Sequence, residues 1–455
     1  MDFFKGRSCR ITYILILACT FICMSIFVFI QPFGDGPDEI NRYKVVSYIE
    51  NHGHIPRGED PEIIIDGYGA SYAFQPILTY MIEGYILHAL SPLHPDPGLK
   101  LIIARYVNVI IGLIAAYFTL KLSKELFKDP MCALMFALGV IFLPQNIFVY
   151  TYVNTDGMGL LSVILMIYGT IKGYRTDFDR RSLISLCTGI ILCLMSYYNC
   201  YGYILTAFIA FVVYFVMHGS YKEMLSKGLL IVLFTALFAG WWFIRNMILY
   251  NGDIFALTAR RECADATGNI LWLENMRNTY KVQGYSLKEM VFGTDYYTLV
   301  WKSFIAMFGP MAIPTHHYVY MSYKYLTCIC ILGLFIPQKT TLLQDRDKKD
   351  SLSFLLTLFT GMLIPAALAL YYSYSWDFQP QGRYYLPCLI PLAMILCVGM
   401  EKLISLIKGF IYRLTQNKKT SEISKVFLYF MIYVFFFMSL VISIYKMISY
   451  YSTNS

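Results

Sequence analysis

Three carboxylates lie close together near the start of the chain. Asp35, Asp38 and Glu39 fall within five residues, directly after an apolar run at residues 11–30 that is long enough to cross a bilayer. A turn of glycine and proline then leads into a segment with helical periodicity. We expect Asp38 and Glu39 to be ionised, because the positive end of that helix favours anions. Ionised carboxylates at a membrane surface suit proton abstraction or metal binding.

The segment after Glu39 predicts a short amphipathic helix that lies along the membrane interface. Its apolar face comprises Ile40, Tyr43, Val46 and Ile49, and its polar face comprises Asn41, Arg42, Lys44 and Glu50. Asp38 and Glu39 are the catalytic candidates on this pattern, with Asp35 in support. The alternative is that Asp38 only caps the helix that starts at Pro37, which is a common arrangement.

Several arginines stand where predicted membrane helices reach the same surface. A guanidinium can hold a phosphate through two donors at once, which makes these residues candidates for phosphate binding. The alternative is a belt of interfacial side chains, in which arginine only reaches for the lipid headgroups. The candidates and their supporting neighbours are Arg105, Arg245 with Asn246, and Arg383 with Gln381 and Tyr384.

The sequence indicates no certain cofactor. A divalent cation, Mg²⁺ or Mn²⁺, is left open, and its ligands would be Asp35, Asp38 and Glu39. The histidines of the outer loops fit no zinc signature, and the twelve cysteines include no CxxC pair. The sequence also lacks a nucleotide-binding P-loop and a GxSxG motif, so a nucleotide-fuelled pump or a serine hydrolase has no support.

The composition is that of a polytopic membrane protein. Hydrophobic residues make up 57% of the 455 residues and charged residues only 15%. The net charge of +8 could attract nucleic acid, but the lysines and arginines are scattered between apolar segments, so membrane topology explains them better. We expect an all-α integral membrane fold and no nucleic-acid partner.

Eleven apolar runs of roughly spanning length predict about eleven transmembrane helices. They are residues 11–30, 99–120, 131–149, 156–171, 183–198, 201–217, 228–247, 318–336, 352–372, 384–400 and 425–447. Residues 73–90 are also apolar but contain Pro76 and Glu83. If this segment lies in the interface or re-enters, every short basic loop falls on one side of the membrane, whereas a spanning segment would move the later loops across. We therefore place it in the interface.

The basic loops then set an orientation, with the N-terminus and the short loops in the cytoplasm. Two longer segments, residues 31–98 and 250–315, fall outside. Loops of this length in a compact protein are more often functional than idle. We expect one polytopic membrane domain over residues 1–455, with interfacial helices in the large first outer loop.

Four short motifs, in this order along the chain, resemble a family of polytopic bacterial membrane proteins with a PDExxH-type motif after the first helix. The matching segments are Pro37-Asp38-Glu39, Asn154-Thr155-Asp156-Gly157, Arg245-Asn246 through Asn251-Gly252-Asp253, and Gln381-Gly382-Arg383-Tyr384-Tyr385-Leu386-Pro387. The likeness spans most of the chain. It fails at Arg42, where the family has histidine, so a role that needs an imidazole there does not carry over. Without the resemblance, Asp156 reads as the N-cap of a helix.

That family is in turn similar to the GT-C superfamily, the membrane glycosyltransferases that use polyprenyl-phosphate sugars. The resemblance implies an inverting transfer of a sugar from a lipid-phosphate donor to a glycan or lipid acceptor of the cell envelope. The reaction would take place on the outer leaflet of the bacterial cytoplasmic membrane. Asp38 would then orient the acceptor hydroxyl or accept its proton, and Arg383 and Arg245 would hold the donor phosphate.

A lipid-linked glycan flippase is the main alternative. A transporter of that kind favours charged groups near the middle of the membrane and helices broken there. The candidate charges lie instead at the outer ends of the predicted helices, which favours a reaction at the surface. A non-catalytic assembly subunit with the same helical shell is a third alternative.

Overall fold

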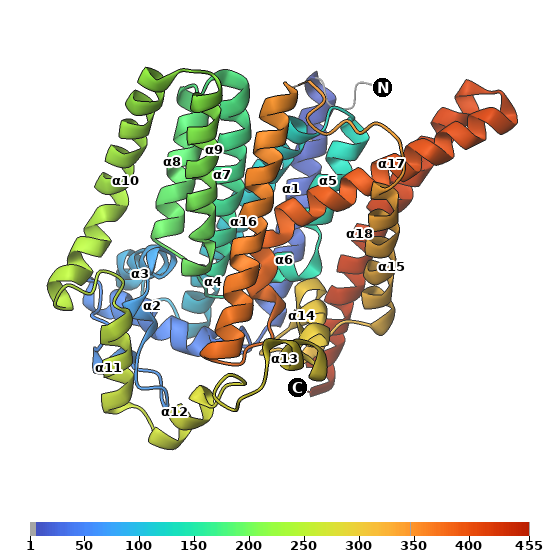
Figure 1. Ribbon diagram of the computed structural model, residues 1–455. Coiled ribbons are helices and arrows are strands. Elements are labelled where there is room, and N and C mark those ends of the chain that lie inside the picture. The colour runs from blue at the N-terminus through green and yellow to red at the C-terminus, as the bar shows by residue number, and fades with distance from the viewer. Residues whose placement is uncertain (1–5, 346, 455) are drawn as a thin grey trace.

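The computed structural model describes residues 6–345 and 347–454 and shows an all-helical membrane protein with almost no sheet (Figure 1). Within those ranges, eight helical segments are long and apolar enough to cross a membrane. Their helices are α1 (Gly6–Ile30), α4 (Pro97–Leu126), α7 (Asp156–Thr176), α9 (Gly202–Met217), α10 (Tyr221–Leu249), α16 (Lys348–Ser375), α17 (Leu389–Thr415) and α18 (Lys418–Asn454). The predicted all-α membrane fold is confirmed.

The remaining apolar runs form helices outside that set. They are α5 (Pro130–Ile141), which is continued by α6 (Pro144–Phe148), α8 (Arg180–Leu194) and α15 (His317–Leu334). Each of the eleven predicted runs therefore coincides with a helix. The number eleven remains a prediction, because length and composition qualify only eight segments in the described part of the chain.

The segment between α1 and α4 forms two helices, α2 (Glu39–His52) and α3 (Leu78–Leu90), and three short 3-10 turns. The turns are η1 (Pro61–Ile63), η2 (Tyr72–Phe74) and η3 (Ser91–Leu93). Helices α2 and α3 pack together at the end of the bundle opposite the N-terminus (Figure 1). The 13 residues of α3 extend about 20 Å, which is short of a hydrocarbon core of about 30 Å. This length favours the interfacial placement of residues 73–90.

The second long segment lies at the same end of the bundle (Figure 1). It contains α11 (Leu257–Thr267), α12 (Ile270–Arg277), α13 (Leu287–Gly293), α14 (Tyr296–Ile305), and the antiparallel strands β1 (Met307–Phe308) and β2 (Ile313–Pro314). Two further 3-10 turns, η4 (Tyr198–Cys200) and η5 (Gly382–Cys388), precede α9 and α17. The termini of many bundle helices thus meet both long segments on one side of the molecule.

Helix α2 forms as predicted, but its buried face matches the predicted apolar face only in part. Val45, Val46 and Ile49 are buried, whereas Ile40 is 50% exposed. Arg42 and Glu50, which the sequence pattern assigned to the polar face, are also buried. The assignment was right for Val46 and Ile49 and wrong for Ile40, Arg42 and Glu50. Both charged side chains are buried because they find ion-pair partners on other elements.

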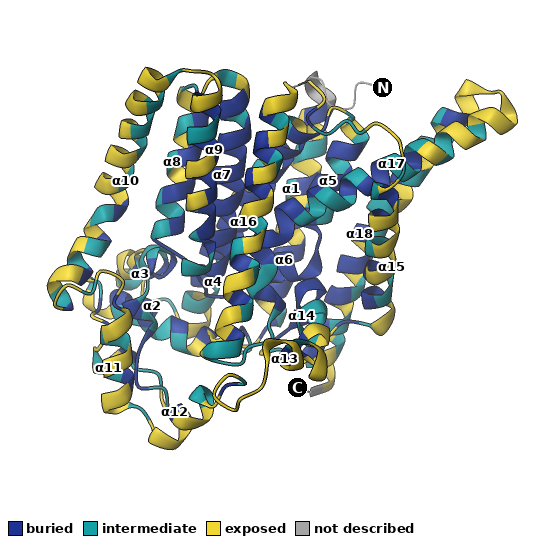
Figure 2. Cartoon of the chain, viewed as in Figure 1, coloured by how far each residue is buried: buried dark blue, intermediate teal, exposed yellow. Residues whose placement is uncertain are grey.

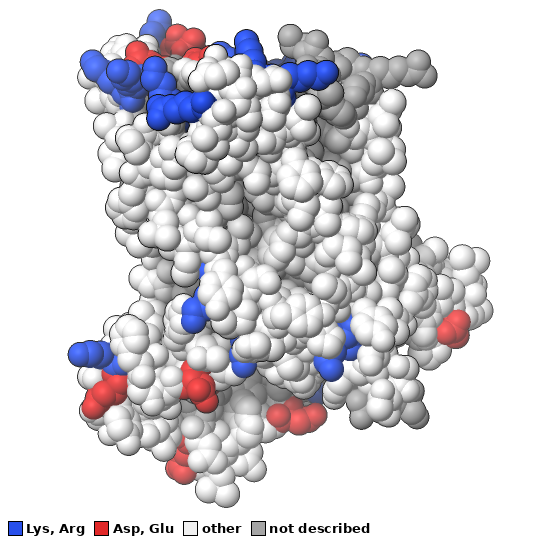
Figure 3. Space-filling model, turned by 90° about the vertical axis from the view of Figure 1, so that its right-hand side faces the viewer, with Lys and Arg blue, Asp and Glu red and all other residues white. Residues whose placement is uncertain are grey.

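Charged side chains separate into two zones along the bundle. On the face shown in Figure 3, lysines and arginines with a few acidic side chains gather at the upper end, a band with very few charges follows, and side chains of both signs are scattered at the lower end. An uncharged band between two charged zones is typical of a protein that crosses a bilayer. Helix α2, which follows the candidate carboxylates, lies at the lower end of the bundle (Figure 1).

The core of the bundle surrounds α7, which is buried almost throughout, whereas α10 is exposed along most of its length (Figure 2). Helices α15 and α17 cross at two glycines. A Cβ on Gly399 would lie 1.8 Å from the carbonyl oxygen of Cys330, and a Cβ on Gly333 would lie 2.1 Å from that of Gly399. Only residues without a side chain permit this approach.

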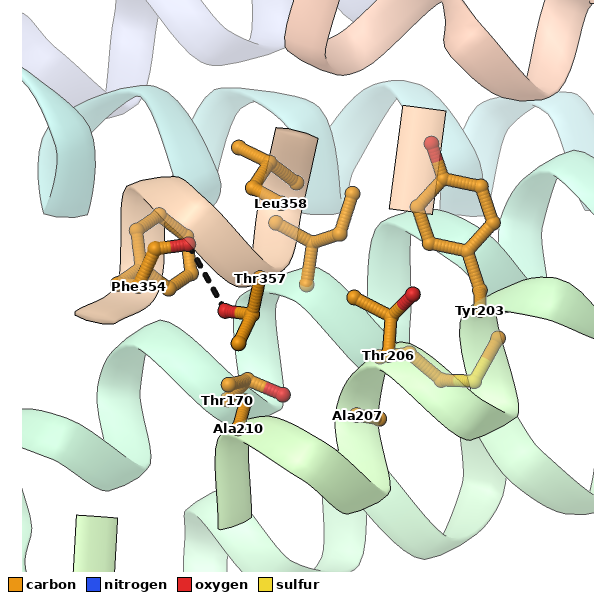
Figure 4. Close-up of a pocket in the computed structure, with 10 residues that line it drawn as sticks. Thr170, Tyr203, Thr206, Ala207, Ala210, Phe354, Thr357 and Leu358 are labelled. Atoms are coloured by element: carbon orange, nitrogen blue, oxygen red, sulfur yellow. Dashed lines mark hydrogen bonds between the residues drawn. The ribbon is translucent and has the colours of Figure 1, made fainter. Parts of the chain in front are cut away.

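A small cavity lies between α7, α9 and α16 (Figure 4). Its volume is about 20 Å³, and Thr170, Thr206 and Thr357 contribute hydroxyl groups to its wall. The Thr357 hydroxyl donates to the carbonyl of Phe354. This volume holds about one water molecule, so the cavity is far too small for a sugar or a lipid tail.

Candidate active site

Asp38 occupies a left-handed backbone conformation immediately before α2, with φ 61° and ψ 11°. Its carboxylate makes no capping hydrogen bond to the helix, so the prediction that it serves only as a cap is wrong. A left-handed conformation is uncommon outside glycine, although aspartate tolerates it better than most residues. Asp38 and Glu39 meet different surroundings, because the Asp38 side chain is 39% exposed and that of Glu39 is fully buried.

Glu39 is bound by Arg105 from α4. Arg105 donates from Nε to Oε1 over 2.8 Å and from Nη2 to Oε2 over 2.6 Å. The backbone N–H groups of Gly34 and Val153 donate to the same carboxylate. The other donors of Arg105 reach the carbonyl oxygens of residues 28, 31 and 32. This pair ties α1, α2 and α4 together and leaves neither side chain free for a substrate.

Four charged side chains form a closed ring of alternating sign, which we call the charge ring (Asp38, Arg42, Asp156 and Arg383). Asp38 Oδ2 lies 2.9 Å from Arg383 Nη2 and 3.5 Å from Arg42 Nη2. Asp156 Oδ2 lies 3.7 Å from Nη1 of each of the two arginines. The ring joins α2, α7 and η5, which are far apart in the sequence. Its net charge is zero, so the low-dielectric surroundings can accommodate it.

Local structure brings each member of the charge ring into place. Arg42 lies one helical turn after Asp38. Asn154 fixes the start of α7, because its side chain accepts from the N–H of Gly157 and donates to two carbonyl oxygens. Gly382 brings η5 against α14, since a Cβ there would lie 2.0 Å from the backbone nitrogen of Phe304.

Asp38 is the one member of the charge ring with substantial exposure to solvent. The side chains of Arg42, Asp156 and Arg383 are between 4% and 6% exposed, against 39% for Asp38. Among the described residues, both oxygens of Asp156 and the Nε and Nη1 atoms of both arginines lack hydrogen-bond partners. Buried polar groups without partners are costly. The ring therefore retains hydrogen-bonding capacity beside its one exposed carboxylate.

Electrostatics keep Asp38 ionised. Burial alone would raise the pKa of Asp38, but the neighbouring Arg383 and Arg42 outweigh it and hold the pKa below the usual value. Tyr72 stands beside this carboxylate, with the Arg42 guanidinium 5.3 Å above its ring. Burial first, and then the Asp38 charge, raise the pKa of Tyr72. The phenol is thus protonated at neutral pH and available as a donor.

A chain of hydrogen bonds leads from the charge ring to a second carboxylate. Arg383 Nη2 donates to the Tyr384 hydroxyl over 3.2 Å, and that hydroxyl donates to Gln379 Oε1. Gln379 Nε2 in turn donates to Asp377. Burial raises the pKa of Asp377, and the Asp38 charge adds to the effect. Asp377 and Gln379 were not among the predicted site residues, although they directly precede the QGRY motif.

The other predicted residues do not join the charge ring. Arg245 donates to the carbonyl of Pro56 over 2.6 Å and stacks on a tryptophan of its own helix, while Asn246 donates to the carbonyl of Ile254. Asp35 makes none of the ion pairs found among the described residues. Gln381 has a buried side-chain oxygen without a hydrogen-bond partner in the same part of the chain. Of the predicted site residues, Asp38 and Arg383 belong to the charge ring and the others do not.

The predicted metal ligands do not form a metal site. Glu39 is bound to Arg105, and Asp38 is bound to two arginines, whose charges oppose a cation at the same carboxylate. Across the described ranges, no three histidine, cysteine or acidic side chains gather closely enough to hold a metal ion. The residues around Asp38 do not fit a divalent cation.

Sequence reasoning undervalued two members of the charge ring. Arg42 was assigned to the polar face of a helix and noted as a departure from the family's histidine, and Asp156 was weighed mainly as a helix cap. The N-x-D-G segment at 154–157 was the signal that could have brought Asp156 forward. No local pattern shows that residues 38, 42, 156 and 383 meet in space.

No protein-family model matches the chain, and a comparison with curated proteins found no match. Solved structures are similar in fold. ArnT from Cupriavidus metallidurans bound to undecaprenyl phosphate matches with a TM-score of 0.55 at 10% identity, over 95% of this chain and 77% of that chain. Archaeal oligosaccharyltransferase AglB from Archaeoglobus fulgidus, in complex with an inhibitory peptide and a dolichol-phosphate, matches with a TM-score of 0.54 at 13% identity, over 97% and 56%.

A second structure of the Archaeoglobus fulgidus oligosaccharyltransferase, in complex with Zn and sulfate, gives a TM-score of 0.54 at 13% identity, over 95% of this chain and 53% of that chain. The chain thus spans about half the length of the archaeal enzyme. ArnT and AglB are members of the GT-C superfamily. The likeness confirms the GT-C-like fold that the sequence motifs implied.

Proposed function

We propose that this protein is a membrane glycosyltransferase that moves a sugar from a polyprenyl-phosphate donor to a glycan or lipid acceptor of the cell envelope. The observation that carries the proposal is Asp38, an ionised carboxylate that is partly exposed and paired with buried arginines within a GT-C fold. The polyprenyl phosphates bound to two similar structures support the class of donor.

Asp38 would orient the acceptor hydroxyl and accept its proton. The hydroxyl oxygen attacks the anomeric carbon, and the bond from that carbon to the phosphate oxygen breaks, with the electron pair passing to the phosphate. A single displacement of this kind inverts the anomeric centre. A carboxylate with a lowered pKa is a weak base, so it acts as the hydroxyl grows acidic in the transition state; general base catalysis contributes about 10²- to 10⁴-fold.

The other members of the charge ring would hold Asp38 in position. Arg383 and Arg42 both pair with the Asp38 carboxylate and so hold it in one orientation. Asp156 neutralises the charge of the two arginines that Asp38 leaves unbalanced. A fixed carboxylate lowers the reorganisation needed when the acceptor binds. Tyr72 and Tyr384 offer hydroxyl groups at the same place.

The proposed placement is the bacterial cytoplasmic membrane, with the N-terminus in the cytoplasm and Asp38 facing outward. The Lys- and Arg-rich end of the bundle supports it (Figure 3), because basic loops stay in the cytoplasm. The charge ring lies at the outer ends of bundle helices, beside α2 and α7, and this favours surface transfer over the flippase alternative.

The test is the composition of lipid-linked and surface glycans, measured by mass spectrometry in cells that lack the gene. The proposal predicts that one sugar is absent and that wild type restores it, whereas Asp38→Asn does not restore it at equal membrane levels. Unchanged sugar composition, with complete lipid-linked glycan accumulating on the inner leaflet, would support the flippase instead.

A further inference from the structure

The arginines that the sequence offered for the donor phosphate are already engaged. Arg105 makes five hydrogen bonds to Glu39 and to three carbonyl oxygens. Arg245 is held by the carbonyl of Pro56. Arg383 is 4% exposed and bound to Asp38. The donors that Arg383 leaves without partners are themselves buried, so a phosphate that arrives from the bilayer needs a more accessible cation.

Arg260, in the first turns of α11, is such a cation. Its side chain is partly buried, and it makes no hydrogen bond or ion pair with any residue that the structure describes. Its Nε atom is buried without a partner, and its guanidinium lies 5.2 Å above the ring of Tyr68. A partly buried guanidinium that makes no ion pair is costly, and an anionic ligand in contact with it would offset that cost.

The third sequence motif fixes the position of Arg260. Asn246 donates to the carbonyl of Ile254, and Asp253 accepts from the N–H groups of Thr258 and Ala259 at the start of α11. The other end of α11 is held through Thr267, whose hydroxyl donates to a carbonyl of the first long segment over 2.6 Å. The motif therefore holds a helix that presents an unpaired arginine.

Arg260 and the charge ring act electrostatically on common neighbours. Asp377 is within electrostatic range of both Arg260 and Asp38, and Tyr372 is within range of Arg260 and Tyr384. A ligand whose phosphate meets Arg260 could place its sugar near Asp38.

An apolar surface leads to Arg260 from the bilayer. Ile254, Phe255 and Leu257, which directly precede it, are 43%, 45% and 56% exposed. Helix α10, which ends at Leu249, is apolar and exposed along most of its length (Figure 2). A cation at the end of such a surface lies at the level of the lipid headgroups. This arrangement favours a phosphate with a long apolar tail over a water-soluble anion.

We propose that Arg260 binds the phosphate of the polyprenyl-phosphate lipid and stabilises the charge that this phosphate gains when its bond to the sugar breaks. The inference rests on the proposed glycosyl transfer and names the residue that receives the leaving group. Proton and electron pair move as described above: the proton passes to Asp38 and the electron pair to the phosphate oxygen that Arg260 faces.

The test is the binding of undecaprenyl phosphate to the full-length protein in nanodiscs, with undecaprenol and phosphatidylglycerol as comparison ligands. Arg260→Gln should weaken binding of undecaprenyl phosphate by about tenfold or more, because a charge-assisted contact to phosphate is lost. Binding of undecaprenol should not change, and Arg260→Lys should restore part of the affinity. Arg261→Gln is the matched control, since its side chain is 64% exposed and only 3.9 Å from Asp265 on the same helix.

The outcomes separate this inference from the proposed function. If wild type prefers undecaprenyl phosphate to undecaprenol, and Arg260→Gln keeps that preference, the assignment of Arg260 is wrong while glycosyl transfer stands. If wild type shows no preference, both proposals fail. If Arg260→Gln weakens the binding of phosphatidylglycerol as much as the binding of undecaprenyl phosphate, Arg260 is a general headgroup contact. Its assignment to the donor phosphate is then overturned.

Discussion

Replacing Glu39 by glutamine tests whether the two adjacent carboxylates have different tasks. The substitution keeps the shape of the side chain and removes its charge. Arg105 would then be left with a single positive charge among three carbonyl oxygens and a neutral amide, at a position that is 2% exposed. The structure gives Glu39 a structural role, so the variant should be less stable than wild type, while the protein that stays folded should keep its activity.

The expected magnitude follows from the burial of the pair. Removing one partner of a fully buried, doubly hydrogen-bonded ion pair costs about 3–5 kcal/mol. The comparison is Asp38→Asn, which also breaks an ion pair. The Asp38 side chain is 39% exposed, so solvent reaches the position of the lost charge, and Asp156 remains as a counter-charge to the two buried arginines. The cost should therefore be smaller, about 1 kcal/mol.

The assay is the midpoint of thermal denaturation in detergent, followed by fluorescence-detected size exclusion, together with sugar transfer by the surviving folded protein. We expect Glu39→Gln to unfold several degrees below wild type and Asp38→Asn to unfold near wild type without activity. A Glu39→Gln protein as stable as wild type but inactive would refute the reasoning, because Glu39 would then be part of the chemistry.

Three further predictions follow from individual contacts. Because Arg383 and Arg42 hold the pKa of Asp38 low, its ionised form persists as pH falls, so transfer should decline only below about pH 4, the usual aspartate value. A decline centred near about pH 6 would contradict a lowered pKa of Asp38. Transfer should persist in EDTA, since two arginines already neutralise Asp38; a loss that Mg²⁺ restores would show otherwise. Gly399→Ala should destabilise the protein by about 1–3 kcal/mol through overlap with Cys330, whereas Gly409→Ala, which meets open space, should not.

The helices could be predicted because their signal is local. Apolar runs of spanning length mark membrane helices in any context, and all eleven predicted runs coincide with helices. The faces of α2 could not be predicted by the same means. Arg42 and Glu50 are buried because Asp156 and Lys100 reach them from other helices, and periodicity carries no information about such partners.

The candidate site was predictable in composition but not in arrangement. The cluster of residues 35–39 drew attention to Asp38, and the QGRY segment drew attention to Arg383. Nothing local shows that Arg383 meets Asp38 across 345 positions of the chain, or that Arg105 meets Glu39 across 66. The sequence also does not predict the left-handed conformation of Asp38. It likewise does not show that the Asp38 carboxylate is exposed and the next one, of Glu39, is buried.

The most direct measurement of the central claim is sugar transfer by purified protein in liposomes. A polyprenyl-phosphate sugar labelled in its sugar is the donor, a membrane extract from cells that lack the gene supplies the acceptor, and wild type is compared with Asp38→Asn. The account predicts transfer of label with release of polyprenyl phosphate by wild type, and a loss of about 10²-fold or more in the variant. Equal rates for the two proteins would contradict it, because the exposed carboxylate of the charge ring would then have no part in the reaction.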